Sequence, residues 1–149
     1  MADEILVDTN VLVYAYDRAE PRKQKQALET LRRLAVGGRG RFSAQILGEF
    51  FRAVTGKIPS PLSPSDAYRQ IATLIRAFSA LPITPLIVLE AARGVRDHRL
   101  NYWDAQVWAT ARLNQIPLVL SEDFKEGFVL DGVRFMNPFA RGFDLGGIV

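Results

Sequence analysis

The chain has 149 residues, 48% of them hydrophobic and 23% charged, which is the composition of one ordinary globular domain. It contains no cysteine, which excludes disulfides, zinc–thiolate sites and cysteine nucleophiles. The net charge is only +3, and the acidic first residues run straight into an apolar stretch, unlike the basic start of a signal peptide. No apolar run approaches the roughly 18 residues of a membrane span. We therefore expect a cytoplasmic protein that does not enter a membrane.

The first predicted element is a strand over residues 5–7, which ends in Asp8, Thr9 and Asn10. A short apolar run with a polar end is typical of a buried parallel strand. Ligands of open α/β sheets bind outside the carboxyl ends of the strands, so Asp8 is a candidate site residue. Alternatively, Asp8 or Asn10 only caps the helix predicted over residues 11–16. No glycine-rich turn follows this strand, which excludes a dinucleotide-binding Rossmann motif.

Apolar periodicity, prolines and glycines predict the elements that follow. Further helices are predicted over residues 22–35, 44–55, 64–79 and 86–99 and after Asn101, and further strands over residues 41–43, 81–84, 116–120 and 132–136. This alternation predicts a single three-layer α/β/α domain, residues 1–139, with a central and mainly parallel sheet of four to five strands. The glycine-rich tail, residues 140–149, is expected to be loosely held.

Three more acids fall where a parallel sheet would bring them towards Asp8. Glu49 lies on the flank of the helix over residues 44–55, Asp104 lies in the first turn after Asn101, and Asp123 follows the strand that ends at residue 120. Each has a plain structural alternative. Glu49 could face solvent, and Asp104 could complete a capping box with Asn101.

Four carboxylates at one edge of a sheet require a compensating positive charge. Two of them about 4 Å apart repel by about 4 kcal/mol at an effective dielectric constant near 20. Thr9, Asn10 and Ser121 accompany the acids, whereas the single histidine, His98, lies elsewhere in the sequence. A donor set made only of oxygen suits Mg²⁺ or Mn²⁺ rather than zinc. Such an ion can activate water and neutralise charge on a phosphodiester during hydrolysis.

Basic residues are concentrated between residues 18 and 41, where they outnumber acids by eight to two. Such a patch suits the phosphate backbone of a nucleic acid, although a solvated helix face is the commoner explanation. The candidate RNA-binding residues in this stretch are Arg18, Arg22, Lys23, Lys25, Arg39 and Arg41.

From Ile5 to about Phe139 the sequence resembles the PIN domain family, specifically the VapC-type toxins of toxin–antitoxin pairs. The motifs that carry the resemblance are Val7-Asp8-Thr9-Asn10-Val11-Leu12, Glu49, Tyr102-Trp103-Asp104-Ala105, Ser121-Glu122-Asp123-Phe124, and Gly132-Val133 followed by Asn137-Pro138-Phe139. None is decisive alone, but their order along the chain is specific.

The resemblance implies a Mg²⁺- or Mn²⁺-dependent endoribonuclease that cuts single-stranded RNA, forms a homodimer and is inhibited by a small VapB-like antitoxin. Its catalytic and metal positions correspond to Asp8, Glu49, Asp104 and Asp123, and its supporting polar positions correspond to Thr9, Asn10 and Ser121. Of the adjacent acids Glu122 and Asp123, the family pattern favours Asp123. The alternative is an inactive RNA-binding or scaffold module, which would gain nothing from four repelling acids.

Overall fold

The computed structural model of the chain describes residues 3–147. Its strands are β1 (Ile5–Val7), β2 (Gly40–Ser43), β3 (Ser79–Leu81), β4 (Leu118–Leu120), β5 (Val129–Leu130) and β6 (Val133–Met136). Its helices are α1 (Thr9–Tyr14), α2 (Pro21–Gly37), α3 (Ala44–Gly56), α4 (Pro64–Ala77), α5 (Pro85–His98), α6 (Tyr102–Leu113) and the short 3₁₀ helix η1 (Leu145–Gly147). Residues 1–2 and 148–149, the outer ends of the predicted domain and tail, lie outside the described residues.

All the strands form one sheet, in the order β3-β2-β1-β4-β6-β5. Every neighbouring pair is parallel except β5 and β6. The α/β class and the mainly parallel sheet are therefore as predicted, but the sheet has six strands rather than four to five. The additional strand, β5, forms a hairpin with β6 through Asp131 and Gly132, both with positive φ. Asp-Gly is a strong signal for such a two-residue turn, and it was available in the sequence.

The edge strand β3 lies two to three residues earlier than predicted. It pairs with β2 through Ser79, Ala80 and Leu81, whereas the sequence suggested residues 81–84. Pro82 has no backbone N–H to donate to a neighbouring strand, so the strand ends before it. Thr84 instead caps α5, because its hydroxyl accepts a hydrogen bond from the backbone N–H of Ile87.

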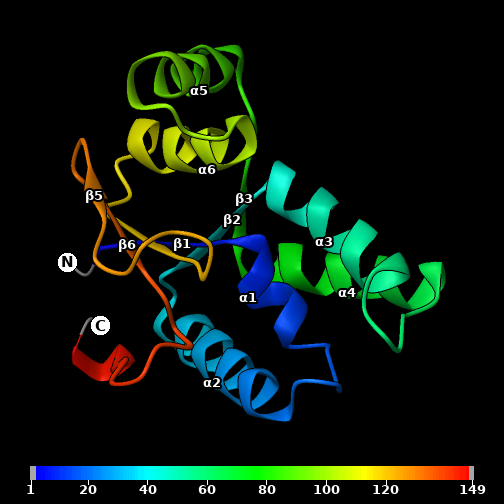
Figure 1. Ribbon diagram of the computed structural model, residues 1–149. Coiled ribbons are helices and arrows are strands. Elements are labelled where there is room, and N and C mark those ends of the chain that lie inside the picture. Colours follow the sequence, from blue (N-terminus) through cyan, green and yellow to red (C-terminus); the bar gives the residue numbers. More distant parts are fainter. Residues whose placement is uncertain (1–2, 148–149) are drawn as a thin grey trace.

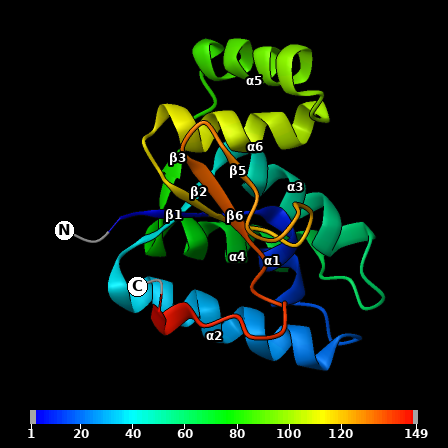
Figure 2. The same cartoon turned by 60° about the vertical axis from the view of Figure 1, so that its left-hand side comes forward.

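Helices cover both faces of the sheet, as expected. Figures 1 and 2 show α5 and α6 on one side and α2 on the other, with α6 between α5 and the sheet. Residues 105–111 of α6 are all buried, because this helix packs against neighbours on both sides. Within residues 3–147, no helix is both long enough and apolar enough to cross a membrane.

Local capping explains where several helices begin and end. The side chains of Ser43, Ser63 and Asn101 accept hydrogen bonds from backbone N–H groups in the first turns of α3, α4 and α6. The predicted caps at Ser43 and Asn101 are thus confirmed. Helix α2 ends at Gly38, whose φ of 68° lies in the left-handed region that glycine adopts without steric cost.

The tail is more firmly held than the sequence suggested. Leu145 is buried, and Phe143 is packed against the hydrophobic core. Figure 2 shows this segment running along α2. The expectation of a loose tail is not met at Phe143 and Leu145, whose apolar side chains reach the core, whereas Arg141, Gly142 and Asp144 are exposed.

Candidate functional site

The carboxyl ends of β1 and β4 lie side by side, since Val7 pairs with Leu120 in the parallel ladder. This register places Asp8 next to Ser121. Asp8 is only 4% exposed, and its carboxylate accepts hydrogen bonds from the Ser121 hydroxyl at 2.8 Å and from the backbone N–H of Thr9 at 2.8 Å. The bond from Thr9 caps α1, so the capping role suggested by the sequence is real but leaves the other carboxylate oxygen facing Ser121.

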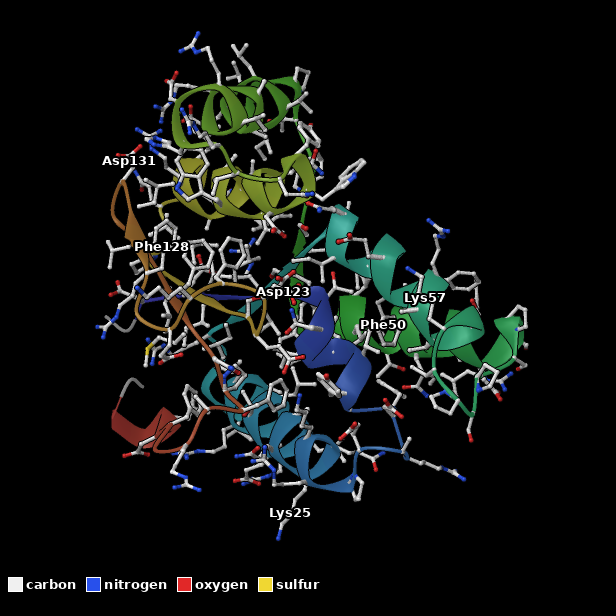
Figure 3. All side chains as sticks on the ribbon, viewed as in Figure 1. Lys25, Phe50, Lys57, Asp123, Phe128 and Asp131 are labelled. Atoms are coloured by element: carbon white, nitrogen blue, oxygen red, sulfur yellow. The ribbon has the colours of Figure 1, made fainter. Side chains whose placement is uncertain are left out.

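Asn10 connects the end of β1 to the loop after β4. Its side-chain amide donates to Ser121 Oγ and to Asp123 Oδ2, each at 3.2 Å. Its carbonyl oxygen accepts a hydrogen bond from the backbone N–H of Glu122 at 3.1 Å. Because both ends of the Asn10 amide are engaged, the loop that carries Asp123 is fixed relative to Asp8. Figure 3 shows Asp123 at this central position, next to α1.

Glu49 reaches the same area from α3. Its Oε1 accepts hydrogen bonds from the Thr9 hydroxyl at 3.0 Å and from the Gln45 side chain at 3.3 Å. Gln45 in turn accepts a hydrogen bond from Gln106 of α6, and Gln106 accepts one from the Tyr102 hydroxyl. This polar chain ties α6 to α3 and orients Glu49. Neither glutamine was predicted from the sequence, although Gln45 lies four residues before Glu49 and Gln106 two residues after Asp104, because the hydrogen bond that joins them spans 61 residues.

Asp104 projects from the first turn of α6 and is partly buried. Asn101 alone supplies the cap, through the N–H of Trp103, and Asp104 accepts no hydrogen bond from any residue within 3–147. A capping box is therefore not formed. Partial burial raises the pKa of Asp104, and the negative charges of Asp123 and Glu49 raise it further.

Electrostatics link Asp8 to the same group of acids. Burial raises the pKa of Asp8 from 3.8 to about 7, against the opposing effect of hydrogen bonds from Ser121 and Thr9. The negative charges of Asp123 and Glu49 add to the increase in the pKa. Four acids from separate parts of the chain thus share one electrostatic environment. We call Asp8, Glu49, Asp104 and Asp123 the four-acid site.

The donor chemistry of the four-acid site fits Mg²⁺ or Mn²⁺, because every ligand atom it offers is a carboxylate oxygen and the four charges repel one another. The side chains do not form a ready coordination shell. Among the described residues, no three His, Cys, Asp or Glu side chains are grouped closely enough to hold a metal ion. Coordination by three of these acids would therefore require side-chain movement.

Glu122 is engaged outside the four-acid site. Its carboxylate lies 2.8 Å from the Lys23 ammonium of α2 and accepts a hydrogen bond of 2.7 Å from the Tyr14 hydroxyl. Lys23 also lies over the Tyr14 ring, 4.6 Å from its centre. These contacts hold Glu122 against α1 and α2, whereas the neighbouring Asp123 is held by Asn10. This difference favours Asp123 as the acid of the site.

The structure does not gather the predicted basic residues beside the acids. Arg39 and Arg41 lie at the amino end of β2, away from the carboxyl ends of the strands, where they bind the Asp3 carbonyl oxygen and the Glu4 carboxylate. Lys23 is paired with Glu122, and Lys25 projects outward from α2 (Figure 3). The remaining two, Arg18 and Arg22, are exposed at or before the start of α2.

An open cleft of about 420 Å³ adjoins the four-acid site. Glu49 and Asp123 line it, together with Asp17 and two basic residues of α3, Arg52 and Lys57. Neither Arg52 nor Lys57 was predicted from the sequence. Both basic residues stand apart from any run of charge, so only the fold reveals their position.

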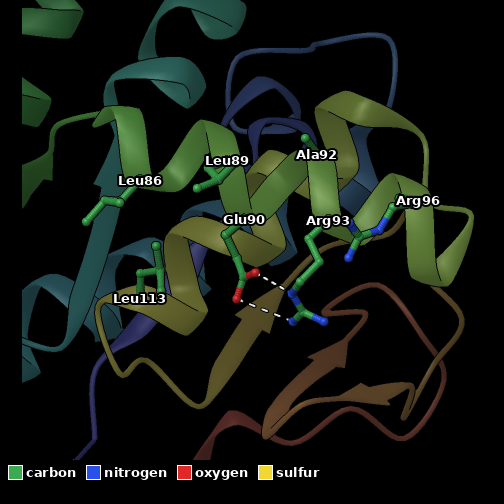
Figure 4. A pocket seen from close by; sticks show the side chains of 7 residues that line it. All are labelled: Leu86, Leu89, Glu90, Ala92, Arg93, Arg96 and Leu113. Atoms are coloured by element: carbon green, nitrogen blue, oxygen red, sulfur yellow. Dashed lines mark hydrogen bonds and ion pairs between the residues drawn. The ribbon is translucent and has the colours of Figure 1, made fainter.

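A larger hollow of about 540 Å³ lies along α5 beside the end of α6, and its lining offers no unpaired acid. Leu86, Leu89 and Leu113 line it (Figure 4). Its acid, Glu90, is bound by Arg93 at 2.5 Å and by Arg112, and the Arg93 hydrogen bond lowers the pKa of Glu90. We therefore place the candidate site at the acids rather than at the larger hollow.

Comparison with known families identifies the domain. A model of the PIN domain matches residues 5–127. The chain belongs to the PIN domain family. The resemblance of the sequence to this family is thereby confirmed. No curated protein sequence matches this PIN domain.

Solved structures of toxin–antitoxin proteins share the fold at low sequence identity. One is a toxin–antitoxin complex from Klebsiella pneumoniae, with 18% identity, a TM-score of 0.67 and coverage of 91% of this chain and 98% of that one. Another is DNA-bound VapBC from Salmonella typhimurium, with 14% identity, a TM-score of 0.64 and coverage of 93% and 99%. A third is VapC20 from Mycobacterium tuberculosis, a sarcin–ricin loop-cleaving toxin, with 18% identity, a TM-score of 0.58 and coverage of 78% and 87%.

Proposed function

We propose that this PIN domain is a metal-dependent endoribonuclease that hydrolyses phosphodiester bonds of single-stranded RNA at the four-acid site. The observation that carries the proposal is the convergence of acids from separate elements, which is fixed by hydrogen bonds from Thr9 to Glu49, from Asn10 to Asp123 and from Ser121 to Asp8. Burial raises the pKa of Asp8 and of Asp104, and the negative charges of Asp123 and Glu49 raise both further. Nothing in the packing of the domain requires four carboxylates in one place. Repulsion between carboxylates is expected in a protein whose active form binds a cation between them.

We infer that Asp8, Glu49, Asp104 and Asp123 would hold Mg²⁺ or Mn²⁺. When bound, such an ion activates water and neutralises charge on the phosphodiester. Asn10, Ser121 and Thr9 orient three of these acids through the hydrogen bonds described above. Asp104 accepts no hydrogen bond from residues 3–147, so its oxygens are available to a ligand or to water.

We also propose that the chain is the toxin of a VapBC-type pair, acts in the cytoplasm, forms a homodimer and is inhibited by a small VapB-like antitoxin. The support is that neighbours in fold include a toxin–antitoxin complex and VapBC bound to DNA, each covering more than 90% of this chain. At identities of 14–18% the likeness shows a shared fold, so binding of an antitoxin and formation of a homodimer are tested separately from cleavage.

The direct test is cleavage of a mixed cellular RNA pool by purified, antitoxin-free protein in Mn²⁺. The controls are the same reaction in EDTA and the Asp104→Asn variant, with folding of both proteins checked by circular dichroism. We expect cleavage that is lost in EDTA and in the variant. Folded protein that binds RNA but cleaves none of the pool would favour the inactive RNA-binding module.

A further inference from the structure

The cleft beside the four-acid site needs positive charge if an RNA strand is to enter it. Each phosphate carries a negative charge, and Asp17, Glu49 and Asp123 already line the cleft. The basic stretch predicted from the sequence cannot supply the compensation there. Lys23 is paired with Glu122, and Arg39 and Arg41 lie at the amino end of β2, away from the carboxyl ends of the strands.

Two side chains of α3 are placed to supply this charge. Arg52 and Lys57 line the same cleft as Glu49 and Asp123, and both are exposed. Neither forms an ion pair within 4 Å with any acid of residues 3–147. Their charges are therefore available to an anion from solution.

The helix geometry sets their order along the cleft. Arg52 follows Glu49 by three residues, so the two side chains lie about one turn apart, with Cβ atoms roughly 5–6 Å from each other. Lys57, the C-cap residue of α3, follows Arg52 by five residues, about 1.4 turns further along. The cations thus extend away from the acids in the direction that a bound strand would continue.

A simpler role for Lys57 is to complement the negative end of the α3 dipole, which requires no ligand. That role does not explain Arg52, which lies five residues earlier. It also does not explain why both residues line the same cleft as Glu49 and Asp123.

We propose that Arg52 and Lys57 each bind a backbone phosphate of single-stranded RNA, next to the phosphodiester that lies at the four-acid site. The proposal rests on the proposed ribonuclease function for its ligand. The cleft, at about 420 Å³, falls within the size range of nucleotide-sized ligand sites. The contact is to phosphate, so it contributes affinity without base preference.

The test separates RNA binding from RNA cleavage by using the Asp104→Asn protein without divalent metal. Anisotropy of a short, labelled, single-stranded RNA of mixed sequence is measured over a series of salt concentrations. The test variant adds Arg52→Gln and Lys57→Gln. The matched control instead adds Arg76→Gln on α4 and Arg134→Gln on β6, two exposed arginines that do not line the cleft. Thermal unfolding of each protein verifies the fold.

We expect the α3 variant to bind about tenfold more weakly and its salt slope to fall by about 1.4, which corresponds to two lost phosphate contacts on single-stranded RNA. The control with Arg76→Gln and Arg134→Gln should stay within about twofold of the parent. A variant that exchanges the two residue types, with Arg52→Lys and Lys57→Arg, keeps both positive charges and should retain most of the salt slope. An unchanged slope in the α3 variant would overturn the proposal. Because no step requires cleavage, the phosphate contact can hold even if the nuclease proposal fails.

Discussion

The hydroxyl of Ser121 donates a hydrogen bond of 2.8 Å to Asp8, across 113 residues of sequence. The same oxygen accepts hydrogen bonds from the Asn10 side chain and from the backbone N–H of Asp123. One buried side chain therefore joins the end of β1 to the loop that carries Asp123. It also stabilises the charged form of a carboxyl that burial would otherwise keep neutral.

Replacing Asp8 by asparagine should stabilise the metal-free protein near pH 8. The folded-state pKa of Asp8, about 7, lies above its ordinary value of 3.8, so between these values the folded protein holds a proton that the unfolded chain has lost. The contribution of Asp8 to the free energy of unfolding is therefore lost as the pH rises from about 4 to 7. The full difference is on the order of 4 kcal/mol, minus the cost of hydrogen bonds that asparagine makes less well.

Urea denaturation of both proteins over this pH range measures the effect. The stability gained by Asp8→Asn should shrink as the pH falls from about 7 towards 4, because wild-type Asp8 is then already neutral. A variant that is less stable than wild type by the same amount at every pH would mean that Asp8 contributes through its hydrogen bonds alone.

Magnesium should raise the melting temperature of the wild-type protein near pH 8. At ten times its Kd, a ligand bound only by the folded state adds about 1.4 kcal/mol, or about 4 °C for a domain of this size. The increase should be smaller near pH 5.5, because protons compete for Asp8 and Asp104. The increase should also be lost in Asp104→Asn. Equal stabilisation of both proteins would place the cation elsewhere on the surface.

The ion pair between Lys23 and Glu122 should contribute measurably to stability. Both side chains are about three-quarters buried, at 26% and 24% exposure, and Tyr14 donates a further hydrogen bond to Glu122. A double-mutant cycle with Lys23→Met and Glu122→Gln should give a coupling free energy of about 1 kcal/mol in urea denaturation. A coupling free energy no larger than the measurement error would mean that solvent screens this ion pair, as it does most surface ion pairs.

Two glycines in helices should respond in opposite directions to alanine. A Cβ at Gly94 of α5 would lie 2.9 Å from the ring of Trp108, which is fully buried, so Gly94→Ala should cost about 1–3 kcal/mol. A Cβ at Gly48 of α3 meets no atom within 4 Å, so Gly48→Ala should add roughly 0.5–1 kcal/mol. Urea denaturation measures both. A neutral Gly94→Ala would mean that α5 can shift away from α6.

The sequence was sufficient to predict the parallel strands at the centre of the sheet, and the acids at their ends, because both depend on local patterns. The apolar runs before Asp8 and Ser121 mark buried strands, and parallel pairing brings their ends together. The electrostatic link between these acids and Glu49 or Asp104 needed the fold. So did the partner of Lys23, since Glu122 lies 99 residues away.

Other features could not be read from the sequence for physical reasons. The run of basic residues is divided by the fold: Arg39 and Arg41 lie at the start of β2, whereas Arg22 and Lys25 of α2 line one hollow, so RNA binding by this run stays a prediction. Arg52 and Lys57 lie five residues apart, and only the fold brings them to the same cleft as the acids. Strand β5, with two residues, is too short to show periodicity, and only its Asp-Gly turn indicated it.

The most direct test of the account is the rate at which the protein cleaves a single-stranded RNA in Mn²⁺ under single-turnover conditions. Each of the four acids is replaced in turn by its amide, and Asp17→Asn, which also lines the cleft, is the matched control. We predict that every variant of the four-acid site loses about a hundredfold or more, while Asp17→Asn stays within about threefold of the wild type. Cleavage that persists in EDTA, or that survives replacement of the four acids, would contradict the assignment of the site.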